Sequence, residues 1–277
     1  MRQIDLHTHT TCSDGTLTPT ELVNYAKEKN LSAVAITDHD NFDGVAEAIK
    51  AGETNDIEVI SGIEMSTDYE DKEIHIVGLF VDTNNKKFNS ELISLKEKRK
   101  KRNLLAVEKL NNLGIDITYE ELESISKNKI ITRAHFAKLL IQKGYISSVK
   151  ECFDKYMGEG MPAYVKREVI PPKETISLIN NSGGIAILAH PLLYKLSELK
   201  LNKMLDYLKS CGLKGMECIY STHTGEETEF LTSIAKKHNL KISGGSDFHG
   251  ENKPNLDLGT GYGKLFVPYS VLENLRN

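Results

Sequence analysis

Histidines recur directly after short apolar runs in this chain, and this arrangement restricts the fold more than any other feature of the sequence. Residues 3–6 read as a strand and are followed by His7 and His9, and the apolar run at 33–36 is followed by His39. An apolar run followed by a histidine occurs again later in the chain. Because the carboxyl ends of parallel strands meet at one face of a barrel, side chains at these positions can share one site.

Helical patterns separate the apolar runs. The segment 18–21 (Thr-Pro-Thr-Glu) is a capping box with proline in the first turn, which predicts a helix to about residue 29. We expect further strands at 57–62, 74–81, 184–188, 215–219, 241–244 and 264–267, and further helices at 45–51, 173–181, 202–211, 226–237 and 270–276. This alternation predicts an α/β fold, a distorted (β/α)7-type parallel barrel that is TIM-like.

One long stretch interrupts the alternation. Residues 84–160 contain no strong strand pattern, whereas the segments 88–112, 119–126, 133–143 and 147–156 read as helices. We therefore predict an α-helical insertion domain at residues 86–160 and a discontinuous barrel made of residues 1–85 and 161–277. The basic run at 96–102 either forms a solvated helix face or contacts phosphate.

Charge and cysteine content argue against several classes of protein. A net charge of −4 does not favour wrapping of long nucleic acid, so phosphate would have to be bound locally. The four cysteines form no CxxC pair. No run approaches the ~20 apolar residues of a membrane helix, and the first residues lack a signal-peptide pattern. We therefore expect a cytoplasmic protein with no membrane contact and no evident obligate protein partner.

Imidazole and carboxylate groups at the strand ends indicate a metal site. His7 and His9 lie two residues apart on an extended chain, so both rings can reach one ion, and Asp247 and His249 have the same spacing. Glu64, expected after the third strand, can bridge two ions about 3.5–4 Å apart. Each pattern is weak alone, but together they predict a metal cluster. Mixed nitrogen and oxygen ligands suit Zn²⁺, Mn²⁺ or Fe²⁺.

Further polar residues fall at equivalent places. His39 follows the second strand, His75 lies in the fourth, and His190 follows the next recognisable strand. His223 follows the sixth strand, and we interpret it as a site residue. Glu217 lies within the sixth strand, where a structural role is the favoured interpretation.

Together these motifs resemble a known family, the PHP (polymerase and histidinol phosphatase) domain. They occur in the family's order at the predicted strand ends: 5–10 (Asp-Leu-His-Thr-His-Thr), 13–15 (Ser-Asp-Gly), 36–40 (Ile-Thr-Asp-His-Asp), 62–64 (Gly-Ile-Glu), His75, 189–191 (Ala-His-Pro) and 244–249 (Gly-Gly-Ser-Asp-Phe-His). Segments 132–137 and 162–165, with the insertion, resemble a subgroup of nucleoside 3',5'-bisphosphate phosphatases and 5'-to-3' exoribonucleases. Ala134 and Lys166 stand where that subgroup often has proline.

The resemblance implies two or three divalent ions (Mn, Fe or Zn) bound by nine side chains. The first ion takes His7, His9, Glu64 and Asp247, the second takes Glu64, His75 and His190, and the third takes Asp14, His39 and His249. Asp14 enters on the resemblance alone, because its loop reads equally well as a turn.

The resulting hypothesis is a metal-dependent phosphoesterase. Its substrate would be a phosphorylated small molecule or nucleotide, chiefly the 3'-phosphate of a nucleoside 3',5'-bisphosphate, or 5'-phosphorylated short RNA. A hydroxide that bridges two metals would attack phosphorus. Arg133 would bind phosphate, with Lys166, Arg167 and His223 as weaker candidates. His223 could instead protonate the leaving oxygen, and Asp247 belongs to the catalytic centre.

Three alternatives stay open on the sequence. The barrel could hydrolyse histidinol phosphate or another small phosphomonoester, although the helical insertion argues modestly against this. It could carry amidohydrolase chemistry, but such sites commonly bridge their metals with a modified lysine, and here Glu64 fits the bridge. It could be a non-catalytic metal-binding module, but such domains usually lose ligands.

Overall fold

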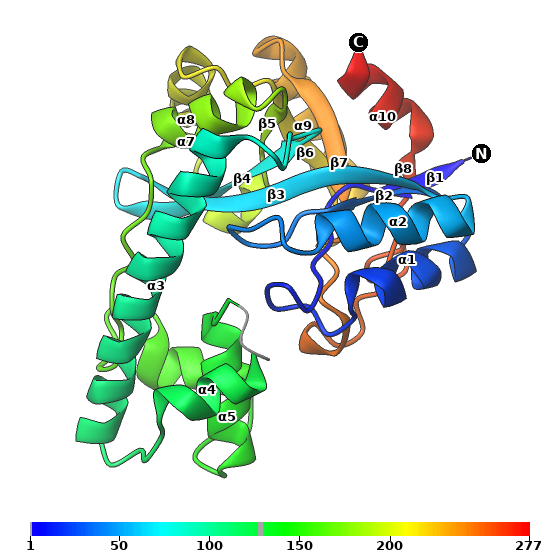
Figure 1. The fold of residues 1–277 in the computed structure, drawn as a ribbon. Helices are drawn as coiled ribbons and strands as arrows, with labels where there is room; N and C mark the ends of the chain where they lie inside the picture. The colour runs from blue at the N-terminus through cyan, green and yellow to red at the C-terminus, as the bar shows by residue number, and fades with distance from the viewer. Residues whose placement is uncertain (1, 127–129) are drawn as a thin grey trace. The chain divides into compact units, whose positions relative to one another are not determined.

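The sequence forms one mixed sheet that carries the predicted strand ends. Within residues 2–126 and 130–277, which the computed structural model describes, this sheet has eight strands in the order β7-β6-β5-β4-β3-β2-β1-β8 (Figure 1). The strands are β1 (Gln3–Asp5), β2 (Leu31–Ile36), β3 (Glu58–Tyr69), β4 (Lys72–Leu79), β5 (Ile185–Leu188), β6 (Gly215–Tyr220), β7 (Lys241–Gly245) and β8 (Val267–Pro268). The apolar run at 33–36 is completely buried in β2, as expected for a strand covered on both faces.

The sheet closes almost completely into a barrel. β1 pairs with β2, β2 with β3, β5 with β6 and β6 with β7, all in parallel. Beyond the ends of β1 and β7, the N–H of Asp247 donates to the carbonyl of His7 (2.8 Å), and the N–H of His9 donates to that of Phe248 (2.9 Å). The predicted TIM-like α/β barrel is therefore confirmed.

The barrel is mostly rather than wholly parallel, because β4 runs antiparallel to both β3 and β5. β3 and β4 form a hairpin whose turn residues, Glu70 and Asp71, have φ values of 47° and 61°. Two-residue hairpin turns require such left-handed backbone, which the sequence did not signal because neither residue is glycine. β3 is also longer than the strand expected at 57–62, so Glu64 lies inside it rather than after it.

Helices α1 (Pro19–Glu28) and α2 (Val45–Asn55) lie side by side in Figure 1 and pack against each other. The predicted capping box is confirmed, since the Thr18 hydroxyl accepts from the N–H of Glu21 and the Glu21 carboxylate accepts from the N–H of Thr18. The other barrel helices are α7 (Pro172–Asn181), α8 (Glu198–Ser210), α9 (Gly225–Lys237) and α10 (Tyr269–Arg276). The last strand is only two residues long, shorter than the 264–267 segment expected.

Apolar side chains from the strands and the last helix fill the barrel core. This core contains Ile4, Leu6, Ala33, Ala35, Ile60, Val77, Leu79, Ile187, Ala189, Leu265, Val267, Val271, Leu272 and Leu275. Alternate residues of β1 and β2 enter it, as the two-residue period of a strand requires. The buried side chains of α10 belong to this core, and the helix contacts β7 and β8.

The chain divides into two compact units, one made of Met1–Asn89 with Val169–Asn277 and the other of Ser90–Glu168. Helix α3 (Lys86–Asn112) begins in the first and continues into the second. The second unit also holds α4 (Tyr119–Ile125), α5 (Arg133–Gln142), α6 (Val149–Cys152) and a π-helical turn (Phe153–Met157). It has its own core, built around Leu110, Leu122, Phe136 and Leu140.

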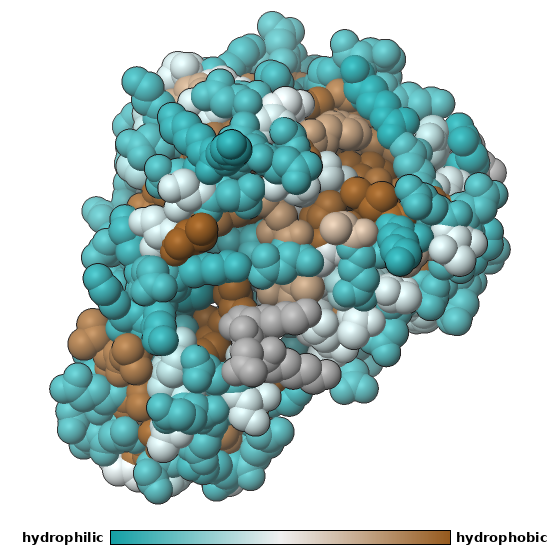
Figure 2. Space-filling view, in the orientation of Figure 1, coloured by the Kyte–Doolittle hydropathy of each residue, from teal (hydrophilic) through white to brown (hydrophobic). Residues whose placement is uncertain are grey.

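Hydrophilic side chains cover most of the face seen in Figure 2, with hydrophobic residues exposed in smaller patches between them. Within the described residues, no helix is both long enough and apolar enough to cross a membrane.

Candidate metal centre

Backbone pairing continues past the strands and fixes the residues that carry the site. Isolated parallel bridges join Thr8 to Phe248 and His39 to Glu64. The N–H of Ala189 donates to the carbonyl of His75 (3.1 Å), which ties the end of β5 to β4. Backbone hydrogen bonds therefore hold the polar residues at these strand ends beside one another, although they are far apart in the sequence.

Glu64 lies at the centre of the cluster, and its two carboxylate oxygens face different histidines. Oε1 lies 2.8 Å from Nδ1 of His75 and 3.1 Å from Nε2 of His190. Oε2 lies 3.4 Å from Nε2 of His7, 3.2 Å from Nε2 of His9 and 3.2 Å from Nδ1 of His39. Each oxygen of Glu64 thus faces its own set of histidines, and this is the geometry that a carboxylate needs to bridge two ions.

Asp247 faces His7 and His9 as well. Its Oδ1 lies 3.7 Å from Nε2 of His7, 3.3 Å from Nε2 of His9 and 3.3 Å from Nδ1 of His249. Its Oδ2 accepts a hydrogen bond from the Tyr220 hydroxyl (2.7 Å) and another from the Lys253 ammonium. Oδ1 thus faces the imidazoles, whereas Oδ2 is held by two hydrogen bonds.

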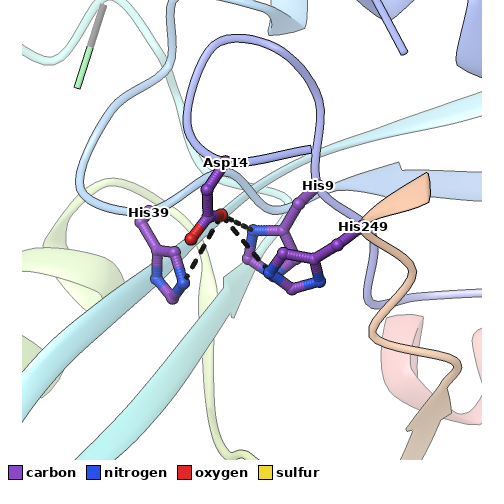
Figure 3. Close-up of side chains that lie close together, drawn as sticks. All are labelled: His9, Asp14, His39 and His249. Atoms are coloured by element: carbon purple, nitrogen blue, oxygen red, sulfur yellow. Dashed lines mark ion pairs between the residues drawn. The ribbon is translucent and has the colours of Figure 1, made fainter. Parts of the chain in front are cut away.

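Asp14 joins three of the imidazoles, as Figure 3 shows. Its Oδ1 lies 3.3 Å from Nε2 of His249, 3.9 Å from Nε2 of His39 and 3.9 Å from Nδ1 of His9. Gly15 closes the loop that carries Asp14, and a Cβ there would meet the His9 carbonyl oxygen at 2.2 Å. The structure therefore brings all nine residues proposed as ligands into one cluster, in which His39 and His75 are partly exposed and the others are buried.

Two carboxylates that the sequence did not assign to the cluster support it. Asp38 accepts hydrogen bonds from the N–H of Thr10 (2.8 Å) and the hydroxyl of Ser13 (2.5 Å), which holds the Asp14 loop. Glu217 accepts from Nδ1 of His7 (3.1 Å) and from the N–H of His190 (2.7 Å). Carboxylates that orient ligating histidines are typical of metal sites. Only the position of Glu217 within β6 could have indicated this role.

Two members of the cluster have strained backbone. Asp247 has φ of 59° and His190 has φ of 28°, and both values lie in the left-handed region. Aspartate and histidine tolerate this conformation better than most residues, but it still has a cost. Such strain is often found at functional sites, where the surrounding hydrogen bonds maintain it.

The comparisons with known proteins match this geometry. The PHP domain model matches residues 5–161. This chain belongs to the PHP domain family. It is 39% identical to a 5'-3' exoribonuclease of Haemophilus influenzae over 93% of this chain and 95% of the relative. It is 31% identical to a 3',5'-nucleoside bisphosphate phosphatase of Chromobacterium violaceum over 94% of this chain and 91% of the relative.

A solved structure agrees on the PHP fold. A protein of Bifidobacterium adolescentis, provisionally described as a metal-dependent phosphoesterase, superposes with a TM-score of 0.88. It is 30% identical and covers 99% of this chain and 96% of the solved chain. The likeness spans nearly all of both chains, so it covers the barrel and the second unit alike.

The PHP cluster is suited to hold divalent metal ions. Nε2 of His7, Nε2 of His9, Nδ1 of His39 and Oδ1 of Asp14 are buried and make no hydrogen bond within residues 2–126 and 130–277. Three groups of ligand atoms lie within 4.8 Å of one another: His9, Asp14, His39 and His249; His7, His9 and Glu64; and His39, Glu64 and His75. A cation would satisfy these buried atoms, which otherwise carry a desolvation cost.

Electrostatics inside the PHP cluster favour charged carboxylates. Burial raises the pKa of Glu64, but the neighbouring His75 and His7 outweigh burial and hold this pKa well below its ordinary value. Burial lowers the pKa of His75, but the Glu64 carboxylate outweighs burial and raises it to about 10. The pKa of His9 is likewise raised to about 9, against burial, by Asp247 and Glu64. Burial dominates at His39 and lowers its pKa to about 3.

We expect metal binding to release protons. Imidazole must be neutral to bind a metal, and raised pKa values keep His9 and His75 protonated at neutral pH. Metal affinity should therefore increase with pH until it passes the pKa values of about 9 and 10. Calorimetric titration of the metal-free protein with Mn²⁺, in buffers of different ionisation enthalpy at pH 7.5, measures the proton release. Binding with no proton release would contradict this account.

Four other residues were predicted as substrate-binding candidates, one in the barrel unit and three in the second unit. His223 packs against Tyr220 with ring centroids 5.3 Å apart, and its Nδ1 lies 3.0 Å from the carbonyl of Cys218. Arg133, Lys166 and Arg167 belong to the second unit, where the Arg133 guanidinium lies 5.3 Å from the centre of the Tyr164 ring. The structure thus brings the predicted metal ligands together, whereas phosphate binding by Arg133, Lys166 and Arg167 stays a prediction.

Two further histidines have structural roles. His135 accepts a hydrogen bond from the N–H of Thr132 (3.0 Å), completing a capping box at the start of α5. His238 ends α9, and its two ring nitrogens contact Asn202 (2.8 Å) and Asp206 (3.1 Å). Both histidines therefore have their contacts at helix ends.

Proposed function

We propose that this PHP protein hydrolyses phosphate esters, and that its substrates are nucleoside 3',5'-bisphosphates and 5'-phosphorylated short RNA. The observation that carries this proposal is the division of Glu64, whose two oxygens face separate sets of imidazoles. Two adjacent ions are the standard means of displacing an oxygen from phosphorus. The names of the Haemophilus and Chromobacterium relatives support the choice of substrate.

We propose the following assignment of ligands, with Mn²⁺, Fe²⁺ or Zn²⁺ as the metal. One ion is held by His7, His9, Glu64 and Asp247, a second by Glu64, His75 and His190, and a third by Asp14, His39 and His249. The distances from Glu64, Asp247 and Asp14 support these groups. His39 also reaches the Glu64 oxygen that faces His7 and His9, so it lies between the first and third positions.

The chain's own residues would orient these ligands for the reaction. Divalent ions bound here would neutralise charge on the phosphate oxygens and supply a water of lowered pKa as the nucleophile. Glu217 accepts the Nδ1 proton of His7, which leaves the lone pair of Nε2 directed at Glu64 and Asp247. Burial of Glu64 and Asp247 excludes bulk water and strengthens each electrostatic contact.

His223 is our candidate for protonating the leaving oxygen. Its Nδ1 can donate to the carbonyl of Cys218, and its Nε2 is buried with no hydrogen-bond partner in the described part of the chain. In the protonated ring, Nε2 therefore has a proton that no protein group in the described chain accepts. The same atom could instead bind a phosphate oxygen of the substrate.

We propose that the helical insertion predicted at residues 86–160 serves substrate binding, together with the adjacent Lys166 and Arg167. Residues 90–168 carry 16 Lys and Arg against 11 Asp and Glu, a net charge of +5, whereas the rest of the chain carries 19 against 28, a net charge of −9. A basic unit attracts anions despite the acidic whole. Arg133 would bind phosphate through its guanidinium fork.

The cytoplasmic location of the protein also stays a prediction.

Phosphate release by the Mn²⁺-loaded protein tests the choice of substrate. We expect turnover of adenosine 3',5'-bisphosphate to exceed that of histidinol phosphate at least about tenfold in kcat/KM, a difference of about 1.4 kcal/mol in transition-state binding. Preference for histidinol phosphate would retain the phosphatase and overturn the nucleotide assignment. If the metal-loaded protein released phosphate from neither substrate, the result would favour another phosphoester as substrate or the non-catalytic module.

A further inference from the structure

Lys253 is a cation at the cluster that the mechanism above does not use. Its ammonium donates to Oδ2 of Asp247, on the side of the carboxylate opposite to the oxygen that faces the imidazoles. It also interacts electrostatically with Glu64 and Asp14, so its charge acts on the centre of the cluster as well as on its nearest partner.

The loop around Lys253 is fastened to the Asp14 loop. The side-chain amide of Asn252 donates to the carbonyl of Asp14 (2.6 Å), and the N–H of Glu251 donates to the Thr16 hydroxyl (3.1 Å). The N–H of Lys253 donates to the carbonyl of Gly250 (3.1 Å). The loop that carries Lys253 is therefore held against the Asp14 loop while Asp247 holds the ammonium, so little conformational entropy would be lost when the ammonium binds a ligand.

The ammonium keeps donors that the protein does not use. Lysine has three N–H donors, and within residues 2–126 and 130–277 the only side-chain partner of Nζ is Asp247. The side chain is 34% exposed, whereas that of Asp247 is 6% exposed. Two donors therefore remain for a ligand that arrives from solvent.

Holding Asp247 in place does not by itself require a lysine. The Tyr220 hydroxyl already donates to the same Oδ2 without adding charge. A lysine beside ligands of divalent cations repels those cations, so it weakens metal binding. An anion above the metals reverses this balance, because it interacts favourably with the ammonium and with the ions together.

We propose that Lys253 binds a phosphate oxygen of the substrate at the metal cluster. The inference rests on the proposed phosphoesterase function and adds a binding residue from the barrel unit itself. Charge-assisted hydrogen bonds are the strong ones, so losing this contact should weaken phosphate binding by about 10- to 100-fold.

Calorimetric titration of the Mn²⁺-loaded full-length protein with inorganic phosphate tests the proposal without turnover. Lys253→Met removes the charge at similar length, and we expect the Kd for phosphate to rise about 10- to 100-fold. Metal content should stay the same or increase, because a repelling cation is gone. Lys264→Met, at an exposed lysine of the same C-terminal segment, is the matched control for net charge and should leave the Kd near wild type.

Tyr220→Phe separates direct binding from an effect through Asp247. It removes the other donor to Oδ2 without changing charge, so it should raise the phosphate Kd much less than Lys253→Met does. Equal losses in both variants would overturn the proposal, as would an unchanged Kd or a loss of metal in Lys253→Met. If wild type binds phosphate through Lys253 but hydrolyses no ester, the proposed function fails and only the phosphate contact of Lys253 is retained.

Discussion

Asp247→Asn is expected to lower kcat/KM by more than about a hundredfold while the fold stays intact. Changing residues that merely orient metal ligands already costs about 10- to 100-fold, and Asp247 itself contacts three imidazoles of the cluster. The amide has the same shape but no negative charge. Asparagine also tolerates the left-handed backbone of this position, where φ is 59°. Phosphate release with saturating Mn²⁺, alongside circular dichroism, measures both effects.

Asp56→Asn is the matched control, because Asp56 is exposed and has the same left-handed backbone, with φ of 54° at the end of α2. It should leave both stability and turnover near wild type. His39→Ala, which removes a side chain between the first and third proposed ions, should abolish turnover as Asp247→Asn does. Near-normal activity of either site variant under saturating metal would contradict the three-ion assignment.

Gly245→Ala is expected to destabilise the barrel and disrupt the cluster together. A Cβ at Gly245 would lie 2.5 Å from both Cβ and the backbone N of His7, closer than real Cβ contacts come. Because these atoms are not the ends of flexible side chains, relief requires movement of the backbone that carries His7. Overpacking of this kind costs about 3 kcal/mol or more, which lowers Tm by roughly 6–12 °C. Thermal unfolding and metal content measure the two effects.

Gly225→Ala provides the comparison for this substitution. A Cβ at Gly225 would meet no atom within 4 Å, and the residue begins α9, where alanine is the better helix former. Its Tm should equal or slightly exceed that of wild type. A Gly245→Ala protein with wild-type Tm and full metal content would show that β1 and β7 are not packed as tightly as the structure has them.

The sequence predicted the elements whose signals are local. The capping box at Thr18 and the apolar run at 33–36 each depend on a few neighbouring residues, and both appear in the structure as expected. His7 and His9 were found because the spacing of two is itself the signal. Strand ends of a parallel barrel converge, so the approximate place of the cluster followed from the order of elements alone.

The sequence did not predict features that depend on distant residues or on unusual backbone. The β3–β4 hairpin was missed because Glu70 and Asp71 adopt left-handed conformations without a glycine. The contact between Glu217 and His7 joins residues 210 positions apart, so the place of Glu217 within a strand did not show which residue it contacts. Lys253 follows the last motif in an ordinary loop sequence, so only the fold reveals that its ammonium reaches Asp247.

Removal and return of metal test the central claim most directly. The protein is stripped with a chelator and dialysed, and phosphate release from adenosine 3',5'-bisphosphate is measured while Mn²⁺ is added back stepwise, with the bound metal counted at each step. We expect no turnover in the metal-free protein and full turnover once two or three ions are bound per chain. Full turnover of the metal-free protein would contradict a metal-dependent phosphoesterase at this cluster.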